Sequence, residues 1–370
     1  MKYYLIAGER SGDLHGGNLI RAILRNDPDA QFRGFGGEQM QTAGMELVVH
    51  YDQLAFMGVV KVLLNFRKIS GYFRQCTDDL LRWKPDVVIL IDYGGFNMRI
   101  ARKIKPLGTR VFYYISPKVW AWNTGRAHKL KATVDRMFCI LPFEKDFFSK
   151  FDWDVDYVGN PVLDAVKAFK SNVAFRDSNR LPGDRPVVAL LPGSRRGEVE
   201  RIAPLMADTA GRFPTIHFAV AAVNTLPRSL YRPLENLPNV QLVFEQTYDL
   251  LQNSTAAVVT SGTATLETAL HRVPQVCVYI TAPIEYAIGK RLLKVPYISL
   301  VNLILNKPAI AELLQHEATL DRLSEELKPL LEDGPRRKQM LSDYAELYQA
   351  LDTGSASDNA GRLMVHYLKA

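Results

Sequence analysis

The sequence is poor in cysteine and contains no long apolar run. Only 3 cysteines occur among 370 residues, and Cys76, Cys139 and Cys277 stand far apart. Such a sparse, odd-numbered set provides neither a disulfide framework nor a metal cage, so we expect reduced cysteines that pack in the interior. No apolar run approaches the ~20 residues that a membrane-spanning helix requires, so none is predicted.

Other expected signals are missing as well. The 7 histidines are scattered, without the HxxxH or HExxH spacing of metal sites, and we predict neither a metal nor a cofactor. The overlapping DxD triplets of Asp152–Asp156 are interpreted as a solvated turn rather than as metal ligands. The apolar run Tyr3–Ala7 is too short for a signal peptide and leads into a glycine turn, which predicts a cytosolic protein.

The composition is that of a soluble globular protein with a basic surplus. Hydrophobic residues make up 47% and charged residues 23% of the chain, and its length predicts two domains of ~150–200 residues. The formal net charge is +7. This surplus suits a nucleic acid, an anionic lipid or a phosphorylated substrate, and an ordinary basic surface is the alternative.

Strand and helix patterns alternate along both halves of the chain. β-branched runs such as Val87–Ile91 are typical of buried parallel strands, and a second series begins at Pro186–Leu191. The pattern predicts an α/β fold: two doubly wound, Rossmann-like domains facing a cleft, with ligands at the carboxyl ends of the strands. Further predicted strands are Tyr3–Ala7, Val111–Ile115, Arg136–Leu141, His217–Val223, Val240–Phe244, Ala256–Thr260 and Gln275–Ile280, and predicted helices include Leu14–Leu24, Arg99–Lys105 and Gly197–Phe213.

A polar stretch with proline and glycine at residues 166–185 is interpreted as a linker. It separates an N-terminal domain, residues 1–165, from a C-terminal domain, residues 186–342. Residues 343–370 are predicted to form helices that pack back on the N-terminal domain.

Two turns at predicted strand ends combine glycine with groups that can bind anions. Gly8–Asp13 opens a helix, whose N-terminus favours an anion, although a tight turn uses glycine for its own reasons. Leu190–Glu198 repeats the design with two arginines, whose guanidinium groups suit phosphate oxygens, and a solvated basic turn is the alternative. The candidate residues in these turns are Ser11, Gly12, Gly193, Ser194 and Arg195.

A third turn, Ser261–Glu267, brings small hydroxylic residues to the start of a helix. Ser261, Gly262 and Thr263 can cradle a phosphate there, and N-capping by a hydroxyl group is the alternative. Glu267 follows one helical turn later, where its carboxylate could accept hydrogen bonds from ribose hydroxyls.

Asp92 stands at the end of the predicted strand Val87–Ile91. A carboxylate at this position can act as a general base on an acceptor hydroxyl, or it can bond the backbone of its own turn. The segment Tyr113–Trp122 adds aromatic rings, among them Trp120, that suit a sugar or an acyl chain and equally suit the core.

The segment Met57–Arg74 interleaves apolar and basic residues, and no acidic residue occurs between Gln53 and Thr77. This pattern fits a helix lying on an anionic lipid surface, and a core helix with a basic outer side is the alternative. Its candidate residues are Val59, Val60, Leu63, Phe66, Arg67 and Lys68.

Together these motifs resemble the lipid-A-disaccharide synthases over nearly the whole chain. The order and spacing of the segments make the resemblance specific. The matching segments are Gly8–Asp13, Met57–Val60, Lys84–Asn97, Ser116–Trp122, Leu141–Lys145, Leu190–Val199, Ser261–Glu267 and Tyr297–Asn302.

The resemblance implies a glycosyltransferase B fold and an inverting, metal-independent transfer. The donor would be UDP-2,3-diacylglucosamine and the acceptor 2,3-diacylglucosamine 1-phosphate, giving the β-1′,6-linked lipid A disaccharide and UDP. It implies an N-terminal domain that faces acceptor and membrane, and a C-terminal donor domain. The family works peripherally at the cytoplasmic face of the inner membrane of Gram-negative bacteria, with no nucleic-acid partner, and a homodimer through the C-terminal region is compatible with it.

Roles transfer to individual residues through the resemblance. Asp92 matches the family's candidate base and Ser11 its glycine-loop serine, and both are predicted to be catalytic. Arg195 matches the nucleotide-site arginine, Glu267 the expected ribose-binding glutamate and Asn302 the asparagine of the late motif.

This chain departs from the family pattern at three places. Arg10 stands where a smaller residue is usual, and Gly94-Gly95 replaces a common Pro-Asp pair, so a second acid beside Asp92 is absent. Asn160 replaces a frequent histidine, so we assign it no proton transfer. Two alternatives stay open: a UDP-N-acetylglucosamine 2-epimerase of the same fold, and a non-catalytic nucleotide-sugar-binding module.

Overall fold

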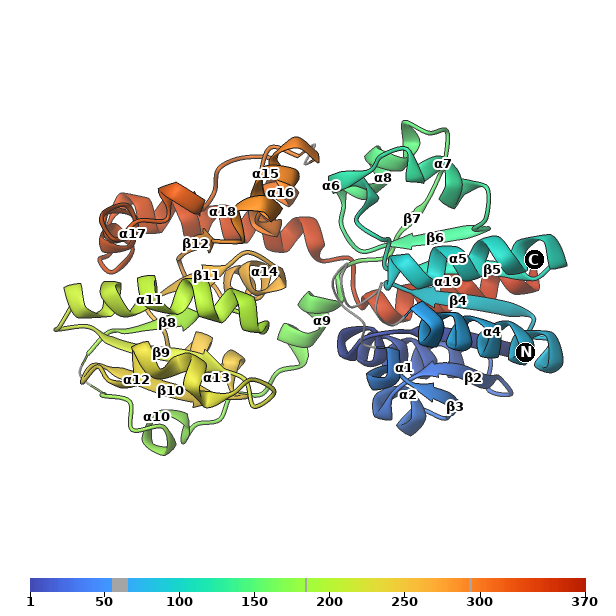
Figure 1. Ribbon diagram of the computed structural model, residues 1–370, viewed down its shortest axis with the longest axis horizontal. Helices are drawn as coiled ribbons and strands as arrows, with labels where there is room; N and C mark the ends of the chain where they lie inside the picture. Colours follow the sequence, from blue (N-terminus) through green and yellow to red (C-terminus); the bar gives the residue numbers. More distant parts are fainter. Residues whose placement is uncertain (55–65, 184, 293–294) are drawn as a thin grey trace. The chain divides into compact units, whose positions relative to one another are not determined.

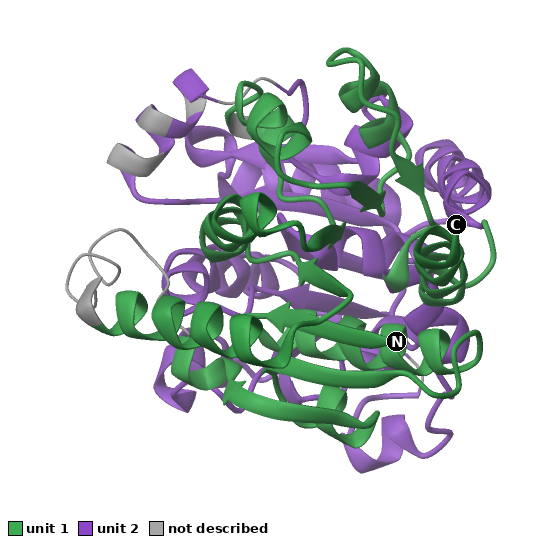
Figure 2. Cartoon of the chain, turned by 90° about the vertical axis from the view of Figure 1, so that its right-hand side faces the viewer, with its two compact units in different colours: residues 1–161, 353–370 green, residues 162–352 purple. Residues whose placement is uncertain are grey.

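The computed structural model describes residues 1–54, 66–183, 185–292 and 295–370. Its contacts divide the chain into two units (Figure 2). Unit 1 comprises Met1–Pro161 together with Thr353–Ala370, and unit 2 comprises Val162–Asp352. The chain therefore enters unit 1 twice.

Unit 1 is built around a parallel sheet with helices on both faces (Figure 1). Its strands are β1 (Lys2–Ala7), β2 (Gln31–Gly36), β3 (Met45–His50), β4 (Val87–Ile91), β5 (Arg110–Tyr114), β6 (Arg136–Cys139) and β7 (Asp156–Tyr157). Its helices are α1 (Arg10–Leu24), α2 (Glu38–Thr42), η1 (Tyr51–Leu54), α4 (Phe66–Trp83), α5 (Gly94–Ile104), η2 (Lys105–Leu107), α6 (Val119–Trp122), α7 (Arg126–Lys131), α8 (Phe143–Ser149) and α19 (Ala356–Lys369).

Unit 2 repeats this architecture around a second parallel sheet. Its strands are β8 (Val187–Leu191), β9 (His217–Ala222), β10 (Val240–Phe244), β11 (Ala256–Thr260), β12 (Gln275–Tyr279) and β13 (Ala311–Leu314). Its helices are α9 (Pro161–Ala168, whose first residue closes unit 1), α10 (Phe175–Ser178), α11 (Arg196–Arg212), η3 (Arg228–Tyr231), α12 (Arg232–Glu235), α13 (Thr247–Gln252), α14 (Thr263–Leu270), α15 (Pro283–Leu292), α16 (Leu300–Leu305), η4 (Gln315–Glu317), α17 (Leu320–Leu327), η5 (Lys328–Leu330) and α18 (Pro335–Leu351).

Both sheets are doubly wound, as the sequence predicts. Among the described residues, the strands of unit 1 follow the order β3-β2-β1-β4-β5-β6-β7, and those of unit 2 follow β10-β9-β8-β11-β12-β13. The order reverses between β1 and β4, where Ala7 pairs with Ile91, and between β8 and β11, where Leu191 pairs with Val259. Ligands of such sheets bind at these switch points, beyond the carboxyl ends of the strands.

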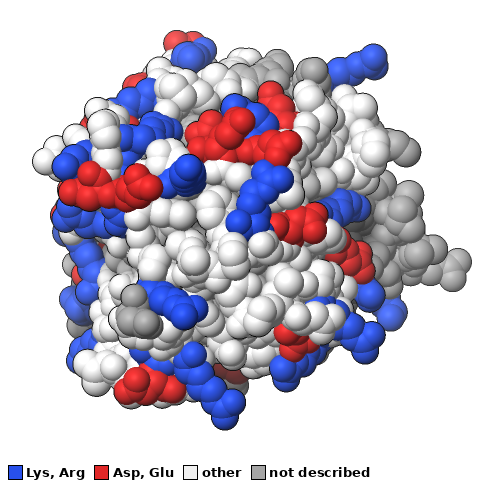
Figure 3. Space-filling model, turned by 90° about the vertical axis from the view of Figure 1, so that its left-hand side faces the viewer, with Lys and Arg blue, Asp and Glu red and all other residues white. Residues whose placement is uncertain are grey.

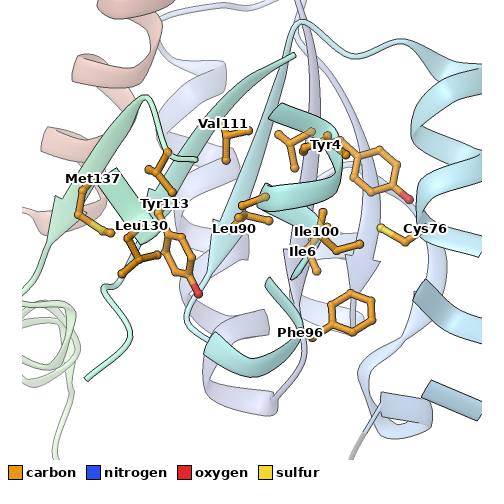
Figure 4. Close-up of a cluster of buried hydrophobic side chains, with 14 of the residues drawn as sticks. Tyr4, Ile6, Cys76, Leu90, Phe96, Ile100, Val111, Tyr113, Leu130 and Met137 are labelled. Carbon is orange, nitrogen blue, oxygen red and sulfur yellow. The ribbon is translucent and has the colours of Figure 1, made fainter. Parts of the chain in front are cut away.

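The sheet of unit 1 is apolar on both faces, which explains its continuous hydrophobic strands. Alternate residues of β4 point to opposite sides, so Val88 and Leu90 join one core cluster while Ile89 joins the other. The first cluster lies against α4, α5 and α7 (Figure 4). The second lies against α1 and α19, where Leu19 and Ile23 fall on one helix face.

Helix α19 brings the end of the chain back onto unit 1 (Figure 1). Its Gly361 fits closely over α1, because a Cβ there would lie 2.8 Å from the Ala22 Cβ. Tyr367 donates a hydrogen bond to Asp156 at 3.0 Å, and the Arg136 guanidinium lies 3.9 Å from the centre of the Tyr367 ring. The C-terminal helix therefore contributes directly to the core of unit 1.

The segment interpreted as a linker, residues 166–185, packs onto unit 2. Phe175 is fully buried in the core cluster of that unit, together with Leu181. Arg176 donates to the Asn253 carbonyl oxygen at 3.1 Å. The segment therefore differs from the predicted linker because Phe175 and Leu181 bury their side chains in unit 2. The polar residues around these two side chains conceal their burial in the sequence.

Several local expectations differ from the structure. The strands β2, β3 and β13 lie where the pattern predicts none, since the glycines of β2 resemble a turn. Helix α1 begins at Arg10 rather than Leu14, so Ser11 and Gly12 lie in its first turn.

The three cysteines are free and buried, and desolvation raises the pKa of each thiol.

Charges of both signs are interspersed on the face of unit 2 in Figure 3. Exposed ion pairs of this unit include Arg212–Asp321 at 2.6 Å and Arg228–Glu235 at 2.6 Å. Such exposed pairs contribute about 0–1 kcal/mol each. No helix in the described part of the chain is long and apolar enough to cross a membrane.

Gly34 should be essential for the sheet of unit 1. It lies in β2 with a φ of 151°, and a Cβ there would overlap the Leu5 carbonyl oxygen of β1. We expect Gly34→Ala to lower the free energy of unfolding by ~3 kcal/mol or more, since backbone must move to admit the methyl group. Chemical denaturation followed by circular dichroism measures the change.

Gly71→Ala is the matched control. Gly71 lies inside α4 with an exposed backbone, and a Cβ there meets no described atom within 4 Å. Alanine should stabilise the helix by about 0.5–1 kcal/mol. Equal effects of the two substitutions would contradict the close approach of β1 and β2 at Gly34.

Candidate active site

The candidate residues of unit 1 gather at the carboxyl edge of its sheet. Gly8 follows β1, Asp92 follows β4, Ile115 follows β5 and Ile140 follows β6. Because β1 and β4 are neighbours at the switch point, the turns that carry Gly8 and Asp92 lie side by side. A Cβ on Gly8 would overlap the Tyr93 ring, so only glycine allows this approach.

Asp92 lies in a strained turn that its neighbours hold in place. Asp92 and Tyr93 both adopt left-handed backbone conformations, with φ of 44° and 47°. Such residues cost about 1–3 kcal/mol each and persist only where surrounding contacts fix them. The Asp92 carbonyl oxygen accepts hydrogen bonds from the Tyr113 hydroxyl at 2.6 Å and the Asn97 amide at 2.9 Å. The Tyr93 hydroxyl donates to the Leu54 carbonyl oxygen at 2.8 Å.

The Asp92 carboxyl is accessible to solvent, yet its protein surroundings raise its pKa. Desolvation is the largest cause, and the positive charge of Lys118 and the backbone N–H of Tyr93 act in the opposite direction. The backbone carbonyl oxygen of Asp92 is hydrogen-bonded within the turn, whereas the residue itself remains exposed at the edge of the sheet. A carboxylate with an elevated pKa in this position is suited to accept a proton.

The Gly8–Asp13 segment leads into the first turn of α1. Ser11 is exposed there, whereas Gly12 and Asp13 are buried. The Asp13 carboxylate accepts backbone N–H groups at the start of α2, from Gly37 at 2.7 Å and Met40 at 3.1 Å. Asp13 therefore fixes the turn, while Arg10 and Ser11 are exposed members of the motif that a ligand can reach.

Trp120 does not offer its ring to a ligand, because only 5% of it is exposed. Its indole N–H donates to the Glu144 carboxylate at 3.1 Å, and its ring packs edge-on against Phe143 at 4.9 Å. Trp120 is therefore a core residue, which is the second of the two interpretations that the sequence left open. No role was predicted for Glu144, although it lies just after a predicted strand end and inside the matching segment Leu141–Lys145.

Glu144 is a buried acid with several hydrogen bonds. It is 1% exposed, and its second carboxylate oxygen accepts the N–H groups of Ile140 at 3.2 Å and Leu141 at 3.0 Å. Desolvation raises its pKa to about 7, and the hydrogen bonds oppose that rise. Its charge contributes to the raised pKa of the nearby Cys139 thiol and Tyr157 hydroxyl.

The proposed lipid-facing segment is described only in part. Val59, Val60 and Leu63 lie outside the described residues, and so do the side chains of Phe66 and Arg67, the first residues of α4. Lys68 is exposed on that helix.

Unit 2 presents backbone and cationic groups at its own switch point. Arg195 precedes α11, and its side chain is 67% exposed. In a capping box, the Glu198 carboxylate accepts a hydrogen bond from the Arg195 backbone N–H at 3.3 Å. Gly193 has a φ of 112°, and a Cβ there would overlap the Glu198 carboxylate. Ser194 is exposed beside them. The turn thus leaves the Arg195 guanidinium free to reach an anion by releasing one exposed ion pair.

The start of α14 faces the same edge. Gly262 adopts φ 158° and ψ −158°, a conformation that other residues rarely adopt, and Thr263 is exposed at the first helical position. The Ser261 hydroxyl donates to the Ile298 carbonyl oxygen at 3.0 Å. Glu267, one turn later, accepts a hydrogen bond from the Tyr248 hydroxyl at 3.0 Å. Desolvation raises the pKa of Glu267, and the Tyr248 hydrogen bond opposes the rise.

Asn302 is buried and bonded within unit 2. Its amide donates to the Ile310 carbonyl oxygen at 2.9 Å and to Glu312 at 2.8 Å, and its oxygen accepts the Ile310 N–H at 3.0 Å. Glu312 also accepts the Ser299 hydroxyl at 2.7 Å and the Ile298 N–H at 3.0 Å. Through Ile298 this network supports the Ser261 turn. Sequence analysis missed Glu312 and Tyr248, because each acts on a residue far away in the sequence.

Asn302 also borders a pocket of about 410 Å³ beside the edge strand β13. Its other lining residues include Tyr297, Glu312, Arg322 and Arg336. In the described ranges, no group of three or more His, Cys, Asp and Glu side chains is arranged to hold a metal ion.

A comparison with family models matches residues 3–363 to the lipid-A-disaccharide synthetase family. The chain belongs to this family. The lipid-A-disaccharide synthase of Geobacter metallireducens is 37% identical, over 98% of this chain and 96% of the relative. That of Myxococcus xanthus is 38% identical, over 95% and 94%. The chain is therefore a glycosyltransferase of lipid A biosynthesis, as the sequence motifs indicate.

Solved structures share the fold. A UDP-GlcNAc 2-epimerase from Neisseria meningitidis, bound to UDP-GlcNAc, aligns with a TM-score of 0.66 over 100% of both chains at 14% identity. The calicheamicin glycosyltransferase CalG4 aligns with a TM-score of 0.64 over 100% of this chain and 98% of its own, at 13% identity. These likenesses confirm the glycosyltransferase B fold of this chain.

Glu144 should make stability depend on pH. Its pKa is about 7 in the folded protein, against an ordinary value of 4.5, so the folded state retains a proton that the unfolded chain releases. Stability should therefore fall as pH rises from about 4.5 to about 7 and then level off. Neither Cys139 nor Tyr157 titrates in this window, because the pKa of each is raised.

Glu144→Gln, which resembles the protonated acid, should remove this dependence. The urea midpoint of the wild type, relative to that of the variant, should decline between pH 5 and pH 8. A constant difference across this range would show that Glu144 does not carry a raised pKa in the folded protein.

Proposed function

We propose that this enzyme transfers 2,3-diacylglucosamine from UDP-2,3-diacylglucosamine to 2,3-diacylglucosamine 1-phosphate. The products are the β-1′,6-linked lipid A disaccharide 1-phosphate and UDP. Membership in the family supports the reaction, and the carboxyl edge of each sheet supplies groups of the required chemistry. The observation that carries the proposal most directly is the fixed turn that presents Asp92 with an elevated pKa.

Unit 2 is proposed to hold the donor. Anions are favoured at helix N-termini, so the starts of α11 and α14 suit the diphosphate, with Arg195 as its charge partner. Glu267 would accept hydrogen bonds from the ribose hydroxyls, and Gly193, Ser194, Ser261, Gly262 and Thr263 would line the phosphate site. Asn302, held inside the protein, would support this edge through Glu312 and Ile298.

Unit 1 is proposed to supply the base. Asp92 takes the proton of the acceptor 6-hydroxyl while that oxygen attacks the anomeric carbon of the donor. The bond between this carbon and the UDP oxygen breaks, and its electron pair leaves with UDP. Arg195 and the helix N-termini stabilise the charge that develops on the diphosphate, and attack from the opposite face inverts the anomeric centre. Ser11, exposed at the same edge as Asp92, would bind the acceptor together with the Gly12 turn.

The acceptor is a lipid, so we also propose peripheral binding at the cytoplasmic face of the inner membrane. The basic and apolar segment Met57–Arg74, which includes the exposed Lys68, would contact the anionic surface. A homodimer through the C-terminal region is part of the same proposal, carried by the family resemblance.

The reaction can be tested by measuring UDP release in detergent, with and without the acceptor, and by scoring the disaccharide by mass spectrometry. We expect acceptor-dependent release and a disaccharide product. Asp92→Asn should lower turnover ~100-fold or more, because a general base contributes a factor of ~10²–10⁴, and should leave the affinity for UDP unchanged.

Near-normal turnover of Asp92→Asn would overturn the base assignment. Conversion of UDP-N-acetylglucosamine without an acceptor, in the absence of any disaccharide, would instead favour an epimerase. The fold likeness to epimerases does not favour that outcome, since it accompanies only 14% identity.

Glu267→Gln should weaken UDP binding by ~10–100-fold, because a hydrogen bond to a charged group is worth about 1.5–3 kcal/mol. Isothermal titration calorimetry measures the affinity. Glu346→Gln is the matched control, since Glu346 is an exposed carboxylate of the same unit that pairs with Lys307. Equal affinities of wild type and Glu267→Gln would remove Glu267 from the donor site.

A further inference from the structure

Glu144 joins two neighbouring loops at the carboxyl edge of unit 1. One carboxylate oxygen accepts the N–H groups of Ile140 and Leu141, in the turn that leaves β6. The other accepts the indole N–H of Trp120, in the loop that leaves β5. Since β5 and β6 are adjacent strands, a single buried acid fixes the exits of both.

The loop from β5 in turn contacts the Asp92 turn. A Cβ on Gly94 would lie 2.9 Å from the Pro117 Cβ, so Pro117 covers the start of α5 immediately after Asp92. The next residue, Lys118, is exposed, and its charge acts on the Asp92 carboxyl. Tyr113, at the end of β5, donates to the Asp92 carbonyl oxygen. The loop thus reaches Asp92 through packing, charge and a hydrogen bond.

We propose that Glu144 is a positioning residue for Asp92: by holding Trp120 it keeps Pro117 and Lys118 against the Asp92 turn. The proposal rests on the proposed role of Asp92 as base. Lys118 and Trp120 lie in the segment Ser116–Trp122 and Glu144 in Leu141–Lys145, both of which match the family pattern.

The consequence concerns the protonation of Asp92. The groups that act on the Asp92 carboxyl are Lys118 and the backbone N–H of Tyr93. Besides desolvation, Asp92 in turn raises the pKa of the Tyr113 hydroxyl, and the Glu9 carboxylate raises that of the Tyr93 hydroxyl. The positive charge of Lys118 favours the ionised base. If the loop loosens, this charge moves away and the pKa of Asp92 rises further, so the carboxyl is ionised only at a higher pH.

The test is the pH dependence of kcat for the full-length enzyme in the disaccharide assay. Trp120→Phe removes only the indole N–H and keeps an aromatic ring against Phe143, and Glu144→Gln changes its acceptor. Both should move the acid limb of the profile to higher pH and lower kcat along that limb, with little change in KM for the donor. Lys118→Met, an exposed substitution that leaves the core intact, should move the limb in the same direction.

Pairing the substitutions sharpens the test. If Glu144 acts through Lys118, the double variant Trp120→Phe/Lys118→Met should shift the limb no further than the larger single shift. Asp135→Asn is the matched control. Asp135 accepts the Val111 N–H at 2.7 Å and pairs with Lys105 at the opposite edge of the same sheet, so its loss should not move the limb.

The outcomes separate this proposal from the proposed function. An acid limb that is absent from the residual activity of Asp92→Asn, yet unmoved in Trp120→Phe, Glu144→Gln and Lys118→Met, overturns the positioning role alone. An acid limb that persists in Asp92→Asn overturns the base assignment itself. Lower thermal midpoints with an unchanged profile would reduce Glu144 to a structural residue, and Lys118→Met decides the matter even if Glu144→Gln fails to fold.

Discussion

A parallel sheet buried on both faces leaves mainly the ends of its strands for polar side chains, and only the carboxyl ends meet helix N-termini. The other features of this molecule depend on that constraint. In unit 1 it gathers Gly8, Asp92 and the loop after β5 at one edge, although they are far apart in the sequence. In unit 2 it gathers Arg195 and the start of α14 in the same way. At the switch point of each sheet, the loops that follow the two adjacent strands, β1 and β4 or β8 and β11, lie where a ligand binds.

The two edges differ in chemistry. The edge of unit 1 carries a carboxyl group in a strained turn, which Tyr113 and Asn97 hold by its backbone oxygen while the side chain stays accessible. The edge of unit 2 carries backbone N–H groups, hydroxyl groups and the guanidinium of Arg195. In the proposed function, proton acceptance and anion binding are thus divided between two doubly wound sheets. This division is what a transfer reaction with a diphosphate leaving group requires.

Much of this arrangement can be predicted from the sequence, because buried parallel strands are apolar throughout and glycine turns mark their ends. The predicted strand Val87–Ile91 is β4 residue for residue, and Asp92 follows it as expected. Residues that act across long separations could not be predicted: nothing local in the sequence pairs Glu144 with Trp120, or Tyr248 with Glu267. The strand β2 was hidden because Gly34 serves close packing there, whereas glycine usually indicates a turn.

A crystal structure of the complete chain with UDP would test the central claim most directly, namely that the carboxyl edge of the second sheet is the nucleotide site. The account predicts the diphosphate at the N-terminal end of α14, within hydrogen-bonding distance of the Gly262 or Thr263 backbone and of Arg195, with the ribose hydroxyls on Glu267. UDP bound elsewhere on unit 2, for example in the pocket beside β13 that Tyr297 and Arg336 line, would contradict it.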